Sequence, residues 1–299
     1  MSIGISYDNF SGNTGDNAIG LSVKKILKQL GKSFEEVSET SDLSSFETII
    51  IGGGLLLREF PFEPQYQRFR IKGNHILNAM GILGAPDDLD FLNEYKYVSV
   101  RSHGDRAKIA QIKNVFVVPC TSMLLEGNPG FQFKFRGPSI GIHLFPEFLS
   151  DQDMSIFISW CKGKIKLGYE LFLIPITIYR NDFEQFQPIA NRIGKGCVLM
   201  PNLDPLDVFT CIGKLTYMIS FSLHGAIFAY KHNVQFLLAN LSEKTHYFLE
   251  DRGLVDYGFK TIAEMMTLFD QAPSMDFSDL IANDLHRLDE HIYTLKSIL

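Results

Sequence analysis

The sequence predicts an α/β protein with two similar lobes, each built on a mainly parallel β-sheet, and a cleft between the lobes. Three observations support this prediction. Apolar runs of strand length alternate along the chain with segments whose apolar residues recur at helical spacing. The apolar run at 48–51 is typical of a buried strand and ends at three glycines, which permit unusual backbone angles, and the run at 218–221 precedes His224 and an apolar helix pattern. A chain of 299 residues is also long enough for two cores of ordinary size.

The N-terminal lobe is predicted to cover residues 1–150. A short strand at 3–5 precedes a helix whose apolar side chains recur from Ile19 to Leu30, and Gly31 is well placed to end that helix. Later strands and helices alternate in the same way. The strands are predicted at 33–37, 48–51, 97–100 and 115–118, and the helices at 73–80 and 105–112.

The C-terminal lobe is predicted to cover residues 151–299. The segment 122–137 is rich in Gly, Pro and Phe and, with 138–148, leads toward this lobe. Its predicted strands are 171–175, 197–200, 218–221 and 234–238, and its predicted helices are 183–193 and 205–212, one after His224, and about 277–298. The last helix carries one apolar stripe, which we expect to pack on a lobe; packing back on the N-terminal lobe is one alternative.

Composition limits the classes of function. The net charge of -6 and the pI of about 5.8 argue against nucleic acid as a partner. The four cysteines are scattered, without a pair or a histidine at metal-ligand spacing, so we expect no metal. The sequence has neither the roughly 20 apolar residues that a membrane span needs nor the pattern of a secretory leader. We therefore expect a cytoplasmic protein, with peripheral contact to the inner face of the membrane left open.

The first candidate site is the turn at 9–19 between the first strand and the first helix. Its glycines allow a tight turn, Asp16 or Asn17 can cap the helix, and the free N–H groups at a helix start can bind an anion or a polar ligand. We select Asn13, Gly15 and Asp16 as ligand-binding residues; the alternative is a purely structural turn. The spacing lacks the third glycine of the dinucleotide motif and the Gly-Lys-Ser/Thr of a phosphate loop.

The second candidate site is the glycine triplet Gly52–Gly54, which follows the strand at 48–51. A glycine triplet costs conformational entropy, so we interpret Gly53 and Gly54 as positions where another group approaches the backbone closely. An exposed flexible turn is the alternative. Arg58 follows, either as a second ligand contact or as an ordinary surface charge.

Arg101 is the third candidate, because it comes directly after the strand at 97–100. An arginine at the carboxyl end of a strand can hold a carboxylate or a phosphate through two parallel hydrogen bonds. A surface ion pair is the alternative.

His224 lies at the junction between the strand at 218–221 and an apolar helix, together with Ser222 and Leu223. A helix N-terminus binds anions, and its dipole disfavours an imidazolium that a bound dianion would favour. His224 is therefore a candidate acid and base, although a lone histidine among apolar residues can also be a core residue bonded to a backbone carbonyl. Lys244 follows the next strand and adds a cation at the same edge.

Four segments in a fixed order resemble the polysaccharide pyruvyltransferase family. The likeness runs from about Ile3 to Leu254, where Lys244 and the segment 251–254 also fit the family's closing pattern. The four segments are Asn13-x-Gly15-Asp16-x-Ala18-Ile19, Gly52-Gly53-Gly54, Val98-Ser99-Val100-Arg101 and Leu223-His224-Gly225-Ala226-Ile227-Phe228-Ala229.

The resemblance implies two Rossmann-like lobes of the GT-B glycosyltransferase type. It also implies a transferase that moves the enolpyruvyl unit of phosphoenolpyruvate onto two hydroxyls of a sugar, forming a pyruvate ketal in bacterial cell-surface polysaccharide synthesis. Phosphoenolpyruvate would be a co-substrate, with no further cofactor, and the acceptor would be a sugar or a lipid-linked oligosaccharide. The oligomeric state stays open.

By the same resemblance, His224 serves the proton transfers and Arg101 helps to hold the donor. We assign Ser222, Leu223 and Lys244 to the donor side as well. The acceptor side is assigned to the loop and glycine residues of the N-terminal lobe, namely Asn13, Gly15, Asp16, Gly53, Gly54 and Arg58.

Two positions depart from the family pattern. Ser222 stands where the family usually has an arginine two residues before the histidine, and Pro119-Cys120 replaces a frequent Pro-Asp. The first change removes a partner for an anion, and Lys244 or Arg58 could supply the missing charge. Two alternative functions follow: a sugar-nucleotide-dependent GT-B glycosyltransferase, and a non-catalytic binding protein on the same fold.

Overall fold

The computed structural model describes residues 2–38, 40–58, 64–85, 87–271 and 274–299. The chain forms two compact units, which are described separately. The division falls between Leu125 and Glu126, whereas the sequence predicts a boundary at 150. Unit 1 consists of Met1–Phe10, Gly15–Leu125 and Ala282–Leu299, and unit 2 of Ser11–Thr14 and Glu126–Ile281.

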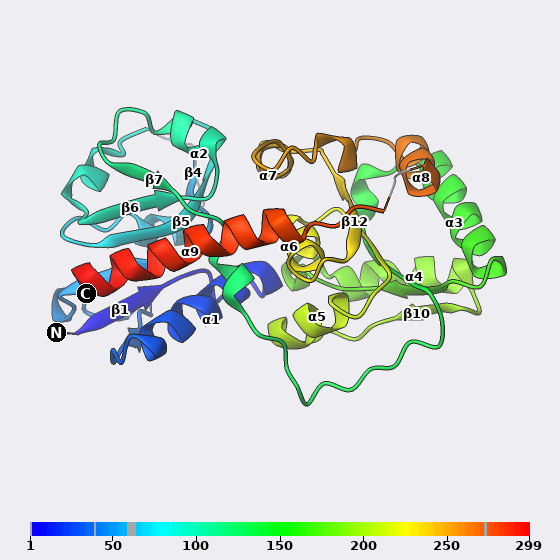
Figure 1. Cartoon of the computed structure of the whole chain (residues 1–299), viewed down its shortest axis with the longest axis horizontal. Helices are drawn as coiled ribbons and strands as arrows, with labels where there is room; N and C mark the ends of the chain where they lie inside the picture. Colours follow the sequence, from blue (N-terminus) through cyan, green and yellow to red (C-terminus); the bar gives the residue numbers. More distant parts are fainter. Residues whose placement is uncertain (1, 39, 59–63, 86, 272–273) are drawn as a thin grey trace. The chain divides into compact units, whose positions relative to one another are not determined.

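Unit 1 is built on a parallel sheet with seven strands in its described part (Figure 1). The strand order is β2-β1-β3-β5-β6-β7, and β4 pairs with β5. The bounds are β1 Ile3–Ser6, β2 Glu35–Glu36, β3 Thr48–Ile51, β4 Gly54–Arg58, β5 Ile76–Leu83, β6 Tyr97–Val100 and β7 Val115–Val117. The order reverses between β1 and β3, and open α/β sheets bind ligands beyond the carboxyl ends of the strands at such a point.

Helices cover both faces of this sheet because its strands are apolar on both sides. Alternate strand residues, such as Ile50 and Tyr97, pack with α1 (Thr14–Gln29) and with the end of α9 (Ser278–Ile298). Their neighbours on the strands face the opposite side and form a second cluster that includes Ile109 beside α2 (His103–Lys108). The residues of α9 from Ala282 onward therefore belong to unit 1.

In its described residues, unit 2 has a six-stranded parallel sheet in the order β10-β9-β8-β11-β12-β13 (Figure 1). The strands are β8 Ser139–His143, β9 Glu170–Leu173, β10 Cys197–Leu199, β11 Tyr217–Ser220, β12 Gln235–Ala239 and β13 Gly258–Phe259. The helices are α3 Asp151–Lys166, α4 Asp182–Ile193, α5 Pro205–Ile212, α6 Leu223–Lys231, α7 Glu243–Glu250 and α8 Ile262–Gln271. Here the order reverses between β8 and β11, which makes their carboxyl ends the expected ligand site.

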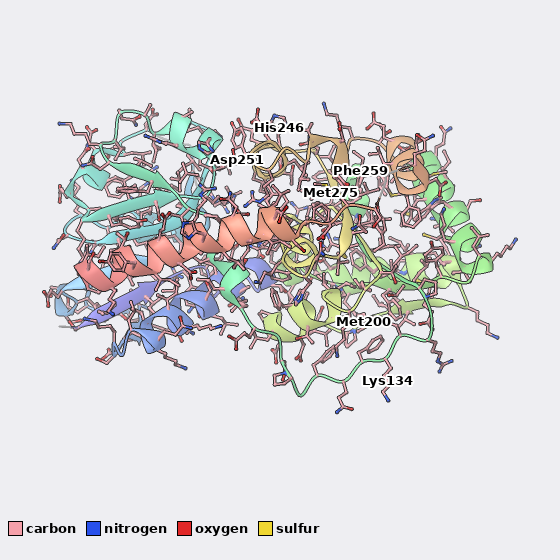
Figure 2. All side chains as sticks on the ribbon, in the orientation of Figure 1. Lys134, Met200, His246, Asp251, Phe259 and Met275 are labelled. Carbon is pink, nitrogen blue, oxygen red and sulfur yellow. The ribbon has the colours of Figure 1, made fainter. Side chains whose placement is uncertain are left out.

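The core of unit 2 also lies on both faces of its sheet. Ile142 and Ile219 pack with side chains of α3, α4 and α8, while Phe236, from the other face of β12, packs against Phe248 and Phe277. The segment before β8 runs over the same unit, and Lys134 extends from it (Figure 2) while Phe135 packs edge-on against Phe172 at 4.9 Å.

The predicted α/β class with two parallel sheets is confirmed, and most predicted elements occur within a few residues of their predicted ends. The predicted helix at 73–80 is wrong, because this region forms the strand β5. β5 is buried on both faces and its apolar residues are nearly continuous, a pattern that spacing alone does not separate from a buried helix. The sequence analysis does not predict β4, β8, β13, α3, α7 or α8. No helix in the described ranges is long and apolar enough to cross a membrane.

Candidate functional site

In unit 1, Asp16 and Gly54 lie close together beyond the carboxyl ends of β1 and β3. Gly54 has φ +101°, and a Cβ at this position would stand 2.5 Å from Oδ1 of Asp16. A Cβ on Gly53 would stand 2.8 Å from the carbonyl oxygen of Ala79. The glycine triplet predicted that another group lies close to this backbone, and in the structure those groups are the Asp16 carboxylate and the Ala79 carbonyl. A role of Gly53 and Gly54 in ligand binding stays a prediction.

Arg101 lies directly after β6 and is only 9% exposed. Its guanidinium covers the backbone of Gly81 so closely that a Cβ there would overlap it. Nε lies 3.9 Å from Oδ2 of Asp105, which also accepts a hydrogen bond from the hydroxyl of Ser102 at 2.5 Å. The arginine is thus held by its surroundings, as a pre-positioned anion-binding group must be.

One nitrogen of Arg101, Nη2, is buried without a hydrogen-bond partner in the described part of the chain. A buried donor left unsatisfied costs about 1–3 kcal/mol, and more when it is charged. An anionic ligand would remove that cost. Among the predicted residues of unit 1, this is the observation that points most directly to a ligand.

The buried thiol of Cys120 lies within hydrogen-bond distance of the hydroxyl of Ser122, at 3.2 Å, and senses the charges of Arg101 and Asp16. Burial raises the pKa of the Cys120 thiol, the charge of Arg101 lowers it, and the charge of Asp16 raises it. Both charges therefore act on the same buried position, where the family pattern would carry an aspartate.

Arg58 ends β4, and its Nε donates to the carbonyl of Leu55 at 2.7 Å.

Asn13 belongs to unit 2, in contrast to Gly15 and Asp16. It forms an isolated antiparallel bridge with Thr177, and the N–H of Thr14 donates to the carbonyl of Ile176 at 3.1 Å. The predicted acceptor loop is thus divided, with its first half bonded to the backbone of unit 2.

His224 lies in the first turn of α6, directly beyond β11 and at the reversal point of the unit 2 sheet. It is 6% exposed. The turn before it is held by Ser220, whose hydroxyl donates to the carbonyl of Ser222 at 2.6 Å. A Cβ on Gly225 would overlap this same hydroxyl, so α6 can lie this close to β11 only with glycine there. Sequence and packing together fix the position of His224.

Leu223 is buried beside His224, and Lys244 lies half-buried in the first turn of α7, beyond β12. β11 and β12 are neighbours in the sheet, so His224 and Lys244 follow adjacent strands at the same edge. The predicted donor residues of unit 2 therefore follow two neighbouring strands, and their role in binding the donor stays a prediction.

Sequence reasoning missed His143, the last residue of β8. Ser220 of β11 is its partner in the strand register, and its ring lies within hydrogen-bond distance of Asp182. The sequence does contain a signal for the strand that carries His143, because apolar residues recur in Ser139–His143 shortly before Pro146. The strand is easily mistaken for part of the connection, since it follows a long Gly- and Phe-rich segment.

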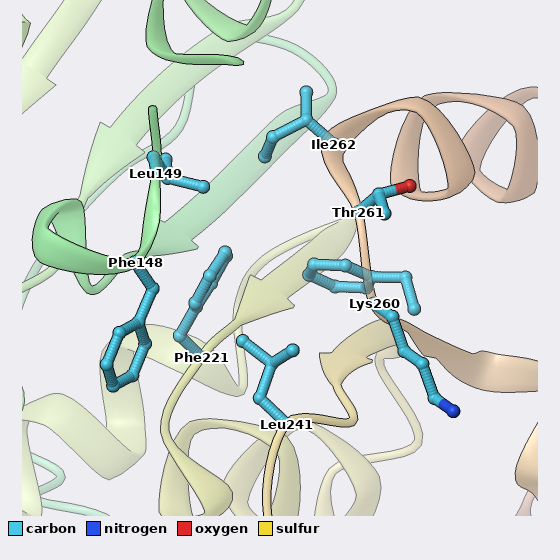
Figure 3. Close-up of a pocket in the computed structure, with 8 residues that line it drawn as sticks. Phe148, Leu149, Phe221, Leu241, Lys260, Thr261 and Ile262 are labelled. Carbon is cyan, nitrogen blue, oxygen red and sulfur yellow. The ribbon is translucent and has the colours of Figure 1, made fainter. Parts of the chain in front are cut away.

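Unit 2 also contains an apolar pocket of about 300 Å³ beyond the ends of β11, β12 and β13. Figure 3 shows Phe148, Phe221 and Leu241 facing the same space, while the amine of Lys260 extends away from it. The first N–H groups near α8 are already engaged, because Glu264 accepts from the N–H of Lys260 at 2.7 Å. The pocket therefore suits an apolar or aromatic group better than a phosphate.

Comparison with known proteins gives the same fold and one family. A family model described as polysaccharide pyruvyl transferase matches residues 13–242, which is more than half of the chain. No curated protein matches the sequence.

Several solved structures are similar in fold. A glycosyltransferase from Rickettsia africae ESF-5 has a TM-score of 0.57 at 11% identity, covering 99% of this chain and 98% of that chain. The UDP-GlcNAc 2-epimerase of Methanocaldococcus jannaschii, in complex with UDP-GlcNAc and UDP, has a TM-score of 0.56 at 9% identity, with 92% and 93% covered. A functionally uncharacterised protein from Klebsiella pneumoniae has a TM-score of 0.53 at 15% identity, with 83% and 87% covered. These identities show the fold alone, which is GT-B-like.

Proposed function

The chain belongs to the polysaccharide pyruvyl transferase family, and on that basis we propose that it transfers the enolpyruvyl unit of phosphoenolpyruvate to a sugar diol. The product is a cyclic pyruvate ketal on a cell-surface polysaccharide or its precursor, and the second product is inorganic phosphate. The acceptor is a sugar or a lipid-linked oligosaccharide. The proposal places the reaction in the cytoplasm, where phosphoenolpyruvate is made, with the inner face of the membrane as the site of a lipid-linked acceptor.

The position of His224 carries this proposal. The reaction needs a group that moves protons beside a dianion, and His224 lies in the first turn of a helix at the reversal point of a parallel sheet. Because the helix dipole disfavours an imidazolium and a bound dianion favours it, donor binding would itself raise the proton affinity of His224.

The proposed reaction is an addition followed by a substitution at the same carbon, C2 of phosphoenolpyruvate. One acceptor hydroxyl attacks C2 of phosphoenolpyruvate and loses its proton, while His224 gives a proton to C3, which becomes a methyl group. The second hydroxyl then attacks C2 and loses its proton, and the C2–O bond to phosphate breaks with its electron pair on the leaving phosphate. The ketal forms without a change of oxidation state.

The residues proposed to bind the donor are Arg101 in unit 1 and Ser222, Leu223 and Lys244 in unit 2. One hydrogen bond to a charged group contributes about 1.5–3 kcal/mol, so two cations and a helix N-terminus are a reasonable minimum for this donor. Arg101 supports the assignment through its buried, unpartnered Nη2 in the described structure. Lys244 would compensate for Ser222, which stands in place of the family's arginine.

The acceptor side is proposed to include Asn13, Gly15, Asp16, Gly53, Gly54 and Arg58.

The test is an incubation with phosphoenolpyruvate and a panel of free or lipid-linked galactosides, mannosides and glucosides. Acceptor-dependent phosphate release is the expected result, together with an increase in acceptor mass equal to pyruvic acid less one water. Phosphate release without modified acceptor, or no release with any sugar on the panel, would contradict the proposal.

A second candidate function is a sugar-nucleotide-dependent glycosyltransferase. The apolar pocket of unit 2 favours it, because the phenylalanine rings that line the pocket could stack with a base. Thermal-shift titration separates the candidates. Stabilisation by phosphoenolpyruvate but not by UDP or GDP supports the pyruvyl transferase. Stabilisation by a nucleotide alone supports the glycosyltransferase, and stabilisation by none of them supports a non-catalytic binding protein.

A further inference from the structure

A buried polar cluster in unit 2 lies outside all the residues selected from the sequence. We infer that its three members, His143, Asp182 and Thr177, are positioning residues that hold the Asn13–Thr14 segment. The consequence for acceptor affinity rests on the proposed function, whereas the consequence for the segment itself does not.

The centre of this cluster is one carboxylate oxygen, Oδ2 of Asp182, the first residue of α4. It accepts hydrogen bonds from the N–H of Ile176 at 2.9 Å, from the N–H of Thr177 at 2.6 Å and from the hydroxyl of Thr177 at 2.8 Å. Nε2 of His143 lies 3.1 Å from the same oxygen. Asp182 is only 2% exposed, so it contributes an ionic anchor inside the unit.

The protonation states of the cluster follow from its geometry. Burial raises the pKa of the Asp182 carboxyl, but the hydrogen bond and charge of His143 and the two backbone N–H groups outweigh burial and lower it. The hydroxyl of Thr177 gives its only proton to Asp182, so it can only accept from His143, whose Nε2 is 3.1 Å away. Nε2 of His143 therefore carries a proton and donates toward both partners.

The backbone held by Asp182 is the same backbone that holds the predicted acceptor loop. Thr177 bridges to Asn13, and the carbonyl of Ile176 accepts from the N–H of Thr14. The hydroxyl and the main-chain N–H of Thr177 both donate to Asp182, while the carbonyl of the preceding residue, Ile176, accepts from the loop. A shift of the Thr177 backbone caused by a change in the cluster would therefore also displace Asn13, its bridge partner.

Stability alone does not account for this cluster. His143 is 0% exposed, and its Nδ1 is buried with no hydrogen-bond partner among the residues described. Buried ionic groups can often be replaced by apolar side chains of similar volume without loss of stability. An apolar side chain in place of Asp182 could not accept hydrogen bonds from the N–H groups of Ile176 and Thr177. This difference supports a positioning role for the cluster.

The test uses two matched pairs of variants. Thr177→Val removes the hydroxyl at constant shape, whereas Thr177→Ser keeps it. His143→Leu removes the donor, whereas His143→Gln keeps an N–H group near the position of Nε2. Asp207→Asn serves as the control, because Asp207 accepts from Asn128 in the same unit at 2.7 Å and does not contact the loop residues Asn13 and Thr14 in any described hydrogen bond.

The first readout is hydrogen exchange at the amide of Thr14, which requires no activity. Thr177→Val and His143→Leu should speed this exchange about tenfold or more, because a hydrogen bond to a charged group is lost. Thr177→Ser, His143→Gln and Asp207→Asn should change it less than about threefold. Unchanged exchange in both Thr177→Val and His143→Leu, or equal acceleration in His143→Gln, would overturn the inference.

The second readout is the kinetics of the transfer. If the proposed function is correct, Thr177→Val should raise the KM for the acceptor with little change in the KM for phosphoenolpyruvate, and Thr177→Ser should restore it. A fall in kcat alone, with acceptor KM unchanged, would contradict the link to the acceptor. If no transfer is found in the wild type, the exchange measurement still decides the positioning role, and the His143 pair replaces the Thr177 pair should Thr177→Val fail to fold.

Discussion

The carboxylate of Asp16 occupies the space that any side chain at position 54 would need, since a Cβ on Gly54 would stand 2.5 Å from Asp16 Oδ1. Gly54→Ala should therefore destabilise unit 1 through both a strained backbone, about 1–2 kcal/mol, and overpacking, about 1–3 kcal/mol. Gly31→Ala is the matched control, because Gly31 has φ +68° but no described atom within 4 Å of the added Cβ.

Thermal unfolding monitored for both variants measures the difference. Gly54→Ala should lower the midpoint clearly more than Gly31→Ala, and adding Asp16→Ala should recover part of the loss. Equal midpoints for the two alanine variants would mean that Asp16 does not constrain position 54.

His224→Ala should reduce turnover by a factor of about 100 to 10,000 if His224 moves protons in the transition state. Binding of phosphoenolpyruvate, followed by calorimetry, should change much less. His286→Ala is the control, because the His286 side chain is 73% exposed and lies in α9. Retained turnover in His224→Ala would remove this residue from the mechanism.

Arg101→Gln should weaken binding of phosphoenolpyruvate by about 10- to 100-fold, the loss of one charged hydrogen bond. The fold should tolerate the change, because Asp105 keeps its bonds from the Ser102 hydroxyl at 2.5 Å and from the Ile82 N–H at 2.8 Å. Arg106→Gln, on the exposed side of α2, is the matched control. Titration of both variants with phosphoenolpyruvate checks the prediction, and equal affinities would contradict it.

Two buried histidines predict that stability falls in acid. Burial lowers the pKa of His291 and of His232 to about 4 in the folded protein, against about 6.5 in an unfolded chain. Between these values the unfolded chain binds a proton that the folded protein does not bind. Each histidine therefore contributes its full effect above pH 6.5, and stability falls as the pH drops from 6.5 toward 4, by up to about 3 kcal/mol for each group.

Urea unfolding between about pH 7 and 4.5 measures this loss, and His291→Gln should flatten the pH dependence of unit 1. The neutral ring of His291 is satisfied on both sides, with Nε2 2.8 Å from Asn78 Oδ1 and Nδ1 3.0 Å from the Tyr97 hydroxyl. A pH profile that is the same in the wild type and in His291→Gln would show that His291 does not contribute.

The order of apolar and polar residues along the chain predicts those elements whose buried residues recur at a clear period or stop at a clear boundary. The helices α5 and α6 and the strands β3 and β6 are of this kind, and so is the turn that carries His224. It failed at β5, where burial on both faces removes the period, and at β8, where a short strand follows an irregular connection. Missing β8 also meant missing His143.

The α/β class, the order of most elements and the family motifs can be read from the chain, because they depend on residues that are close together in it. Which groups meet depends on the tertiary structure. Parallel sheets pair strands that are far apart in sequence, so the approach of Asp16 to Gly54, the contact of His143 with Asp182 and the attachment of Asn13 to Thr177 depend on strand order and register. No spacing along the chain encodes those distances.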